Sequence, residues 1–410
     1  MERRSYTIVT ASYWGFTLTD GALRMLVLLH FHSLGYSSVQ LAFLFLLYEA
    51  CGVVTNLLGG WIGSRFGLKL TLFSGLATQV VALLALSLVQ PGWLEVLSVT
   101  YVMAAQALSG VAKDLTKMSS KSAVKLLIPA LGSQDAENRA LFKWVAVLTG
   151  SKNALKGVGF LLGGVLLGWI GFQLTLWLMA GALSVTLLVG LLTMRQDLGR
   201  SKVKVKFTQL FSKSREINYL SFARFFLFGS RDIWFVVALP VFLKETLQWS
   251  FAAVGAFMAA WVIGYGLIQA GAPALLRHGG AGSALRWAGI LTAVTGSLAL
   301  AVEIEFQLGI VVLVGLAVFG MVFAVNSAVH SYLILAYTDS DEVALNVGFY
   351  YMANAGGRLI GTLLSGVVYL SHDLPGCLWV STGFVAMATA LTALLRKQAK
   401  LGPVLEGAEK

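Results

Sequence analysis

Long apolar segments separated by short polar ones run through the whole chain. A helix that crosses a bilayer needs about 20 mostly apolar residues, and by that measure the sequence predicts about twelve membrane-spanning helices. They cover residues 7–31, 39–63, 69–89, 93–115, 141–169, 173–194, 218–242, 250–275, 284–302, 307–336, 343–370 and 376–395. We therefore expect an all-α integral membrane protein with twelve transmembrane helices.

Helix-breaking and small residues support these boundaries. Proline ends or kinks a helix, and five prolines fall at or near predicted ends, namely Pro91, Pro129, Pro240, Pro273 and Pro375. Glycines spaced four apart allow two membrane helices to approach closely. The pairs Gly159-x-x-x-Gly163 and Gly357-x-x-x-Gly361 are therefore interpreted as packing seams.

A single long charged stretch divides the apolar segments into two sets of six. The expected divisions are an N-terminal six-helix bundle (1–194), a basic cytoplasmic linker (195–217), a C-terminal six-helix bundle (218–395) and a cytoplasmic tail (396–410).

The two halves also share a sequence pattern. The segment "KGVGFLLGGVLLG" (156–168) aligns without gaps with "RLIGTLLSGVVYL" (358–370), which places Lys156 on Arg358. The match predicts two pseudosymmetric bundles, each with a cation at the same depth of an equivalent helix.

The distribution of charge along the chain predicts its orientation in the membrane. The sequence is 57% hydrophobic and 12% charged, whereas soluble proteins carry about a quarter charged residues. The net charge of +11 lies mainly on alternate connections and the two ends, while the opposite face has essentially one cation, Lys244. This asymmetry is the positive-inside rule, so we expect cytoplasmic N- and C-termini and no binding of nucleic acid.

Ionisable residues at membrane depth are costly and point to function. Near predicted helix centres stand six cations (Arg24, Lys152, Lys156, Arg224, Arg231 and Arg358) and three acids (Asp20, Glu49 and Asp232). Pairing every acid leaves three positive charges, so the transported substrate is expected to be an anion, bound by arginines and lysines.

The sequence also suggests how these charges pair. Asp20 and Arg24 are four residues apart on one helix and could satisfy each other, whereas Arg231 and Asp232 point to different faces and are not expected to pair. Glu49 has no obvious local cation. Structural ion pairs remain the alternative role for any one of these residues.

The residues assigned to the site follow from this census. All six cations are substrate-binding candidates together with Asn153 and Asn354, and Asp20, Glu49 and Asp232 are proton-coupling candidates. Other polar residues that could complete the site are Gln106, Asn326 and His330. We expect no catalytic residues, metal or cofactor, because no nucleophile–base set or metal spacing stands out, and the protein is interpreted as not an enzyme.

A loop between the second and third predicted helices carries a family signature. "GGWIGSRFGLK" (59–69) resembles the G-x-x-x-D-R-x-G-R-K loop of the major facilitator superfamily, with Gly60, Arg65, Gly67 and Lys69 matching and Ser64 in place of the aspartate. The resemblance implies two six-helix bundles that alternate access to a midplane site. The missing aspartate puts the loop's conformational latch in doubt.

Three stretches resemble a narrower family. "ASYWGFTLTDGALRMLVLLHFHSLGY" (11–36), "LSGVAKDLTKMSSKSAVKL" (108–126) and "FKWVAVLTGSKNALKGVGF" (142–160) are similar to the ArsJ family of organoarsenical efflux permeases from bacterial arsenic-resistance operons. The resemblance implies a bacterial inner-membrane exporter of 1-arseno-3-phosphoglycerate. That anion forms when glyceraldehyde-3-phosphate dehydrogenase, the implied functional partner, uses arsenate in place of phosphate.

The residues agree with such a substrate without singling it out. Trivalent arsenic would favour clustered thiols, but only Cys51 and Cys377 are present, in separate apolar segments. An ordinary organophosphate such as phosphoglycerate remains the alternative substrate, and a non-transporting sensor with the same fold is a third possibility. The other expected partners are the lipid bilayer and protons as coupling ion, and we expect a monomer.

Overall fold

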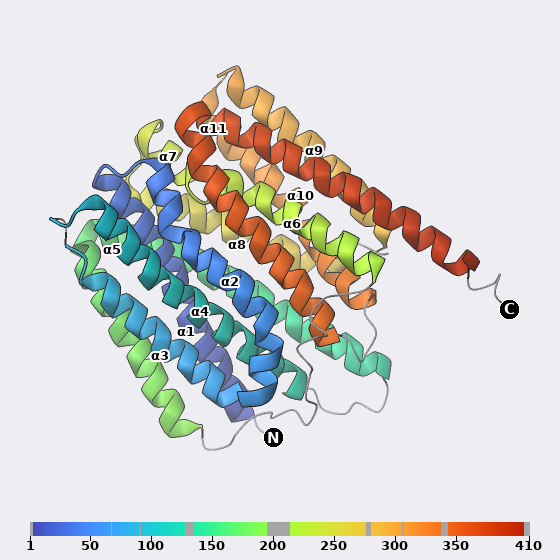
Figure 1. Cartoon of the computed structure of the whole chain (residues 1–410), viewed down its shortest axis with the longest axis horizontal. Coiled ribbons are helices and arrows are strands. Elements are labelled where there is room, and N and C mark those ends of the chain that lie inside the picture. The colour runs from blue at the N-terminus through green and yellow to red at the C-terminus, as the bar shows by residue number, and fades with distance from the viewer. Residues whose placement is uncertain are drawn as a thin grey trace. The chain divides into compact units, whose positions relative to one another are not determined.

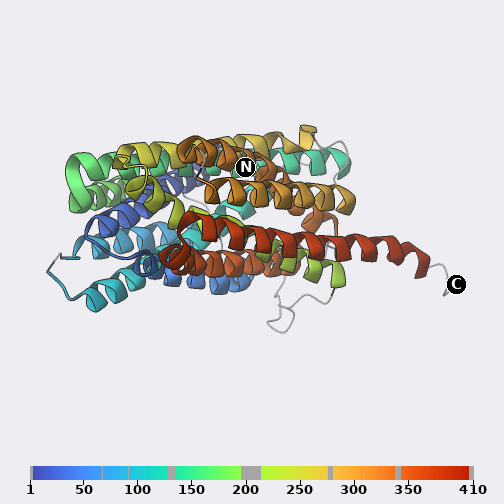
Figure 2. The same ribbon diagram turned by 90° about the horizontal axis from the view of Figure 1, so that it is seen from above.

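The computed structural model describes the backbone of residues 3–66, 68–90, 92–127, 134–194, 214–275, 280–305, 307–337 and 343–405. Side chains are described over residues 7–56, 58, 69–90, 92–117, 120, 151–194, 214–272, 280–305, 307–334, 337, 346 and 348–396. Every regular element within these ranges is an α-helix (Figures 1 and 2).

The helices follow the predicted apolar segments. They are α1 (Arg3–Ser33), α2 (Ser38–Phe66), α3 (Leu68–Ser87), α4 (Glu95–Leu127), α5 (Gln134–Thr193), α6 (Arg215–Phe235), α7 (Ala238–Glu245), α8 (Phe251–Leu275), α9 (Ala281–Glu303), α10 (Leu308–Ala336) and α11 (Val343–Leu405).

Two of these elements are each a pair of helices joined at a sharp break. Gly171 interrupts α5 with φ 78°, and Asp373 interrupts α11 with φ 51°. With these breaks, and with α6 and α7 taken as one span, the described helices form twelve rods. Nine described stretches are long and apolar enough to cross a membrane, and two of them, Ser151–Thr193 and Gly348–Arg396, cover a broken pair. The less apolar α1, which carries Asp20 and Arg24, is the twelfth rod.

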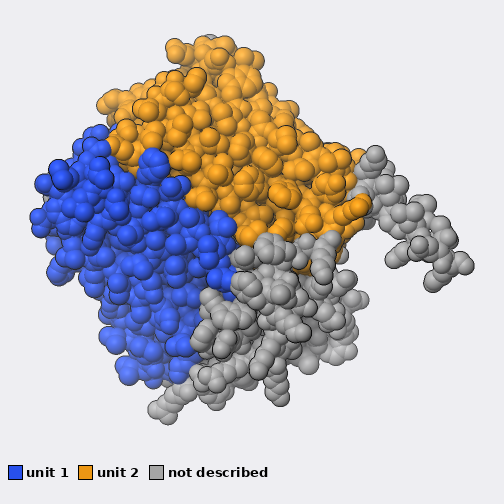
Figure 3. Space-filling model, viewed as in Figure 1, with its two compact units in different colours: residues 1–36, 43–207, 249–270 blue, residues 37–42, 208–248, 271–410 orange. Residues whose placement is uncertain are grey.

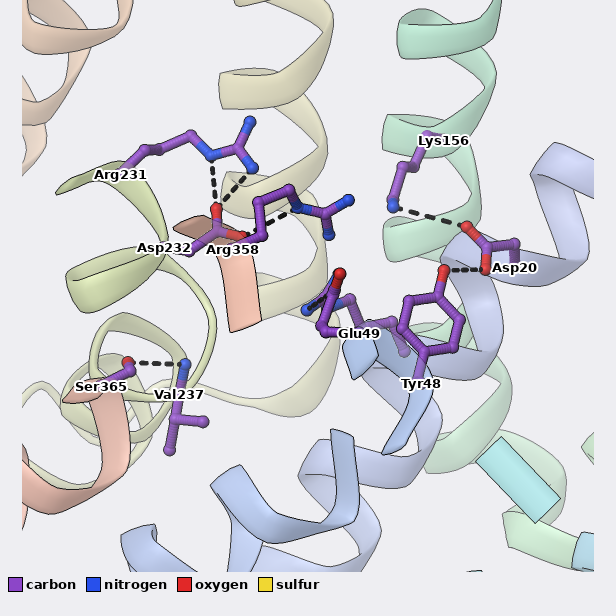
Figure 4. Close-up of polar contacts among 10 residues, drawn as sticks. Asp20, Tyr48, Glu49, Lys156, Arg231, Asp232, Val237, Arg358 and Ser365 are labelled. Carbon is purple, nitrogen blue, oxygen red and sulfur yellow. Dashed lines mark hydrogen bonds and ion pairs between the residues drawn. The ribbon is translucent and has the colours of Figure 1, made fainter. Parts of the chain in front are cut away.

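The break between α6 and α7 has an identifiable cause. Pro240 lacks the N–H that would bond the carbonyl of Val236, so the helix cannot run continuously through this point. Ser365 of α11 compensates, because its hydroxyl accepts hydrogen bonds from Val237 N and Ala238 N at 3.2 and 3.1 Å (Figure 4). The span therefore stays buried without an orphaned donor at these two amides.

The chain forms two compact units. Unit 1 comprises residues 1–36, 43–207 and 249–270, and unit 2 comprises residues 37–42, 208–248 and 271–410 (Figure 3). The first residues of α2 thus group with unit 2, and most of α8 groups with unit 1. The division into two six-helix domains with a linker at 195–217 stays a prediction, and residues 195–213 of that linker lie outside the described residues.

In unit 1, glycines bring α1 and α5 into backbone contact. A Cβ built on Gly159 would lie 2.4 Å from Leu18 O, one on Gly163 would lie 2.3 Å from Ala22 O, and one on Gly21 would lie 2.5 Å from Lys156 O. Any side chain at these positions would force the helices apart. Of the predicted seams, Gly159-x-x-x-Gly163 therefore packs α5 on α1.

Glycines also bring two helices of unit 2 into backbone contact. A Cβ on Gly357 would lie 2.0 Å from Phe225 O, and one on Gly361 would lie 2.6 Å from Gly229 O. The second seam thus packs α11 on α6, which is the most extensive helix pair described. Gly159 and Gly361, which the sequence match aligns, therefore both lie in close helix contacts, whereas Gly163 aligns with Ser365 and Gly357 aligns with Leu155.

Candidate functional site

The first ion pair lies in unit 1, at the seam between α1 and α5. Lys156 Nζ lies 3.4 Å from Asp20 Oδ2, and Tyr48 of α2 donates a hydrogen bond from its hydroxyl to Asp20 Oδ1 at 2.6 Å (Figure 4). Asp20 is buried and Lys156 half-buried. The close approach at Gly21 produces this pair, because it sets the Lys156 backbone against the residue next to Asp20.

A second ion pair in unit 1 joins α1 to α2. Arg24 Nη2 donates to Glu49 Oε1 at 3.2 Å, with Glu49 0% exposed and Arg24 8% exposed. The Arg24 guanidinium also lies over the rings of Phe45 and Tyr48, 5.3 and 5.8 Å from their centroids. The expected pairing of Asp20 with Arg24 is therefore wrong, and Glu49, which has no local cation in the sequence, receives one from another helix. Helix packing brings nearer partners than the same-helix neighbour.

In unit 2 one aspartate is shared by two arginines. Arg358 of α11 donates from Nε to Asp232 Oδ2 at 3.0 Å, and Arg231 donates from Nε to Asp232 Oδ1 at 2.7 Å (Figure 4). Asp232 is fully buried. The prediction that Arg231 and Asp232 do not pair is wrong, because the long guanidinium folds back onto its neighbour. Asp232 on α6 and Arg358 on α11 repeat the relation of Asp20 on α1 to Lys156 on α5.

Arg224 is a buried cation held by neutral groups. Its Nε donates to Asn354 Oδ1 at 3.1 Å, and its Nη1 donates to Ser327 O and Oγ, each at 3.2 Å. Its guanidinium stacks on Phe228 at 3.8 Å from the ring centroid, and it is 4% exposed. Among the described side chains no carboxylate lies within ion-pair distance of Arg224. An isolated buried charge is expensive unless something compensates it.

The two units differ in charge balance. The described cluster of unit 1 pairs two acids with Lys156 and Arg24. The described cluster of unit 2 has three arginines and one acid, which leaves two positive charges. Two of the three surplus positive charges predicted from sequence thus fall on α6 and α11, and the third, Lys152, lies on α5 of unit 1.

Other polar residues predicted for the site are also placed by the structure. Asn153 donates from Nδ2 to Gln269 Oε1 of α8 at 3.0 Å, and Lys152 lies half-buried one turn before Lys156. His330 and Gln106 are both buried, and His330 Nδ1 and Gln106 Nε2 have no hydrogen-bond partner in the described part of the chain.

The loop signature is only partly described. Lys69 lies at the start of α3. Gly67 and the side chain of Arg65 lie outside the described residues, and so do the surroundings of Gly60.

Sequence reasoning missed a buried polar network between α2 and α4. Asp114 Oδ2 accepts a hydrogen bond from Thr55 Oγ1 at 2.5 Å, and Asp114 Oδ1 accepts one from Asn56 Nδ2 at 3.3 Å. Lys117 Nζ lies 3.6 Å from Asp114 Oδ1 and donates to Asn56 Oδ1 at 2.8 Å. The predicted helix 93–115 ends one residue after Asp114 and leaves out Lys117, but α4 continues through Leu127. The sequence feature that could have indicated this network is the spacing of Asp114 and Lys117, which places them on one helix face.

Comparison with known proteins bears on both halves of the chain. Residues 220–409 match the family model of the Major Facilitator Superfamily. A search of curated protein sequences gives no match.

Solved transporters share the fold over nearly the whole chain. A bacterial homologue of the iron transporter ferroportin, in its inward-facing state, aligns with TM-score 0.68 and 18% identity, covering 96% of this chain and 99% of that one. Its outward-facing state gives TM-score 0.70 and 17% identity, covering 96% and 100%. A single-residue mutant of the nucleoside transporter NupG gives TM-score 0.71 and 14% identity, covering 95% and 99%.

The fold and the long apolar helices thus define a multi-pass membrane protein. The predicted all-α, major facilitator fold is confirmed. The family match covers the second half of the chain, and the likeness to the solved transporters shows the fold of the whole chain. They do not support the narrower resemblance to the ArsJ family.

Proposed function

We propose that the protein is a secondary active exporter of a small organic oxyanion, and specifically of 1-arseno-3-phosphoglycerate, by alternating access. The observation that carries the proposal is the positive surplus of unit 2, where Arg224 has only neutral partners and Asp232 is shared by two arginines. An arriving phosphate or arsenate group would neutralise that surplus and accept charge-assisted hydrogen bonds from the guanidinium groups.

The substrate-binding groups follow from these contacts. Arg224 would bind the oxyanion most directly, because no acid competes for it, and Asn354 would orient its guanidinium. Arg231 and Arg358 would share the anion with Asp232.

The role of unit 1 follows from its two ion pairs. We assign the Lys156–Asp20 pair to coupling, because protonation of Asp20 would release Lys156 from its partner. Glu49 and Asp232 remain the other proton-coupling candidates.

An ordinary organophosphate such as phosphoglycerate is the second candidate substrate. Guanidinium and ammonium groups recognise phosphate and arsenate by the same charge and hydrogen-bond geometry. The choice of the arsenical rests on the sequence resemblance, which also implies the bacterial inner membrane and the dehydrogenase partner.

Arsenate resistance separates the two substrates. In an arsenate-sensitive bacterial host, the chain is expected to confer resistance and lower cell arsenic only when glyceraldehyde-3-phosphate dehydrogenase is co-expressed. Resistance without the dehydrogenase would indicate export of free arsenate. No resistance in either strain, despite normal insertion in the membrane, would favour the organophosphate.

A further inference from the structure

A small cavity lies in unit 1, between α1, α2 and α4. Its volume is about 10 Å³, and its lining consists of Asp20, Leu23, Arg24, Phe45, Tyr48 and Gln106. A cavity of roughly 10–15 Å³ accommodates one water molecule if two to four polar groups surround it. Four of the six lining residues are polar, so the cavity meets both conditions.

Gln106 gives a reason, separate from the size of the cavity, to expect a water molecule in it. Its side chain lines the cavity and is 2% exposed, yet Nε2 has no hydrogen-bond partner among the described residues. Buried amides in folded proteins almost always have a partner, in protein or in ordered water. An orphaned amide in the wall of a polar, water-sized cavity points to a water molecule.

The lining offers the hydrogen bonds that one water needs. Gln106 Nε2 and Arg24, which has N–H groups beyond the one bonded to Glu49, can donate to the water oxygen. Asp20 and the Tyr48 hydroxyl oxygen can accept the two water protons, since Tyr48 uses its own proton on Asp20.

We propose that this cavity holds one ordered water molecule, kept in place by Gln106, that joins the Asp20–Lys156 pair to the Arg24–Glu49 pair. The charged and titratable groups around it on the packed helices are Asp20 and Arg24 of α1, Tyr48 and Glu49 of α2, Lys113 of α4 and Lys156 of α5. Lys113 reaches this group through the Tyr48 ring, with Nζ 3.9 Å from its centroid.

The water gives Asp20 a contact through which its proton can be exchanged. An excess proton that reaches the water as hydronium passes to the Asp20 carboxylate and leaves neutral water behind. This consequence rests on the coupling role given to Asp20 in the proposed function, whereas the water site itself does not.

Radiolytic hydroxyl-radical labelling of the full-length protein in lipid tests the water site directly. Radicals generated from a buried water oxidise the side chains beside it, so Tyr48 and Phe45 should be labelled although both are buried. Phe16 is equally buried but belongs to an apolar cluster with Val9, Leu72 and Leu183, and it should stay unlabelled. Labelling of Tyr48 and Phe45 no faster than that of Phe16 would overturn the proposal with the wild-type protein alone.

A matched pair of variants shows whether Gln106 holds the water. Gln106→Met keeps the side-chain length and removes the amide, and it should reduce labelling of Tyr48 and Phe45 at least several-fold. Gln79→Met is the control, because Gln79 is also fully buried and its Nε2 also lacks a partner among the described residues, but Gln79 does not line the cavity. Unchanged labelling in Gln106→Met, or an equal loss in Gln79→Met, would contradict the assignment. No substrate is needed, so the outcome is independent of whether the proposed transport activity is correct.

Discussion

Arg358 and Asp232 are joined across α11 and α6 by a hydrogen bond of 3.0 Å, directly beside the glycine seam of these helices. Lys156 and Asp20 stand in the equivalent relation across α5 and α1 of unit 1. In each unit an aspartate of one helix faces a cation of a second helix, and glycines bring the two backbones together. The difference is Arg231, which adds a second cation to Asp232.

The shared aspartate is expected to stabilise unit 2 strongly. Asp232→Asn would remove the acid that Arg231 and Arg358 share, and removing one partner of a buried pair typically costs about 3–5 kcal/mol. We expect a clear fall in the midpoint of thermal unfolding in detergent. The double variant Asp232→Asn/Arg358→Gln should recover part of the loss, and wild-type stability of the single variant would contradict the buried ion pair.

For the Lys156–Asp20 pair, we expect a different pattern of unfolding midpoints among the single and double variants. Lys156→Gln alone leaves a buried carboxylate and should lower the unfolding midpoint, while Asp20→Asn/Lys156→Gln should restore most of it, because both charges are gone. If the pair couples transport to protons, the folded double variant should transport at a rate that no longer changes with pH. A double variant with the pH profile of the wild type would exclude this pair from coupling.

The glycine seam predicts strong intolerance of a single methyl group. A Cβ on Gly357 would lie 2.0 Å from the Phe225 carbonyl oxygen, so Gly357→Ala must push α11 away from α6. Overpacking of this kind typically costs about 1–3 kcal/mol. Gly383→Ala is the control, because no atom lies within 4 Å of its added Cβ. The two variants are compared by yield of monodisperse protein and by unfolding midpoint, and equal behaviour would contradict the packing.

Much of this architecture follows from the sequence. The apolar segments predict the helices closely. The thickness of a bilayer fixes the length of a spanning helix, and a spanning segment of this length satisfies its own backbone hydrogen bonds only as a helix. The alignment of Lys156 with Arg358 also identifies two residues that turn out to have equivalent aspartate partners.

The pairing of the charges could not be predicted in the same way. Asp20 and Arg24 share one helix face, yet each finds its partner on another helix. Which helix lies beside α1 depends on close approach at Gly21 and Gly159, and the spacing within a single helix does not contain that information. The sequence likewise predicts a helix end near Pro240, whereas the chain continues as a second short helix, α7.

Arg224 should separate binding from stability. Its partners Asn354 and Ser327 are neutral, so Arg224→Gln leaves no buried acid unpaired and the protein should still fold. Losing charge-assisted bonds to the anion should weaken substrate binding about 10- to 100-fold. Arg224→Lys should be intermediate, because lysine keeps the charge but not the planar, two-sided donor geometry. The measurement is the substrate concentration for half-maximal transport, and an unchanged value in Arg224→Gln would remove Arg224 from the site.

The most direct test of the proposed function is arsenic accumulation in everted membrane vesicles, whose outer surface is the cytoplasmic face. The vesicles receive arsenate, glyceraldehyde-3-phosphate, NAD⁺ and glyceraldehyde-3-phosphate dehydrogenase, so that the organoarsenical forms outside them. Vesicles with the wild-type protein should accumulate arsenic only in the complete mixture, and vesicles with folded Arg224→Gln should accumulate little. Accumulation that persists without the dehydrogenase, or none in the complete mixture, or equal uptake by Arg224→Gln, would contradict the account of an organoarsenical anion bound by the arginines of unit 2.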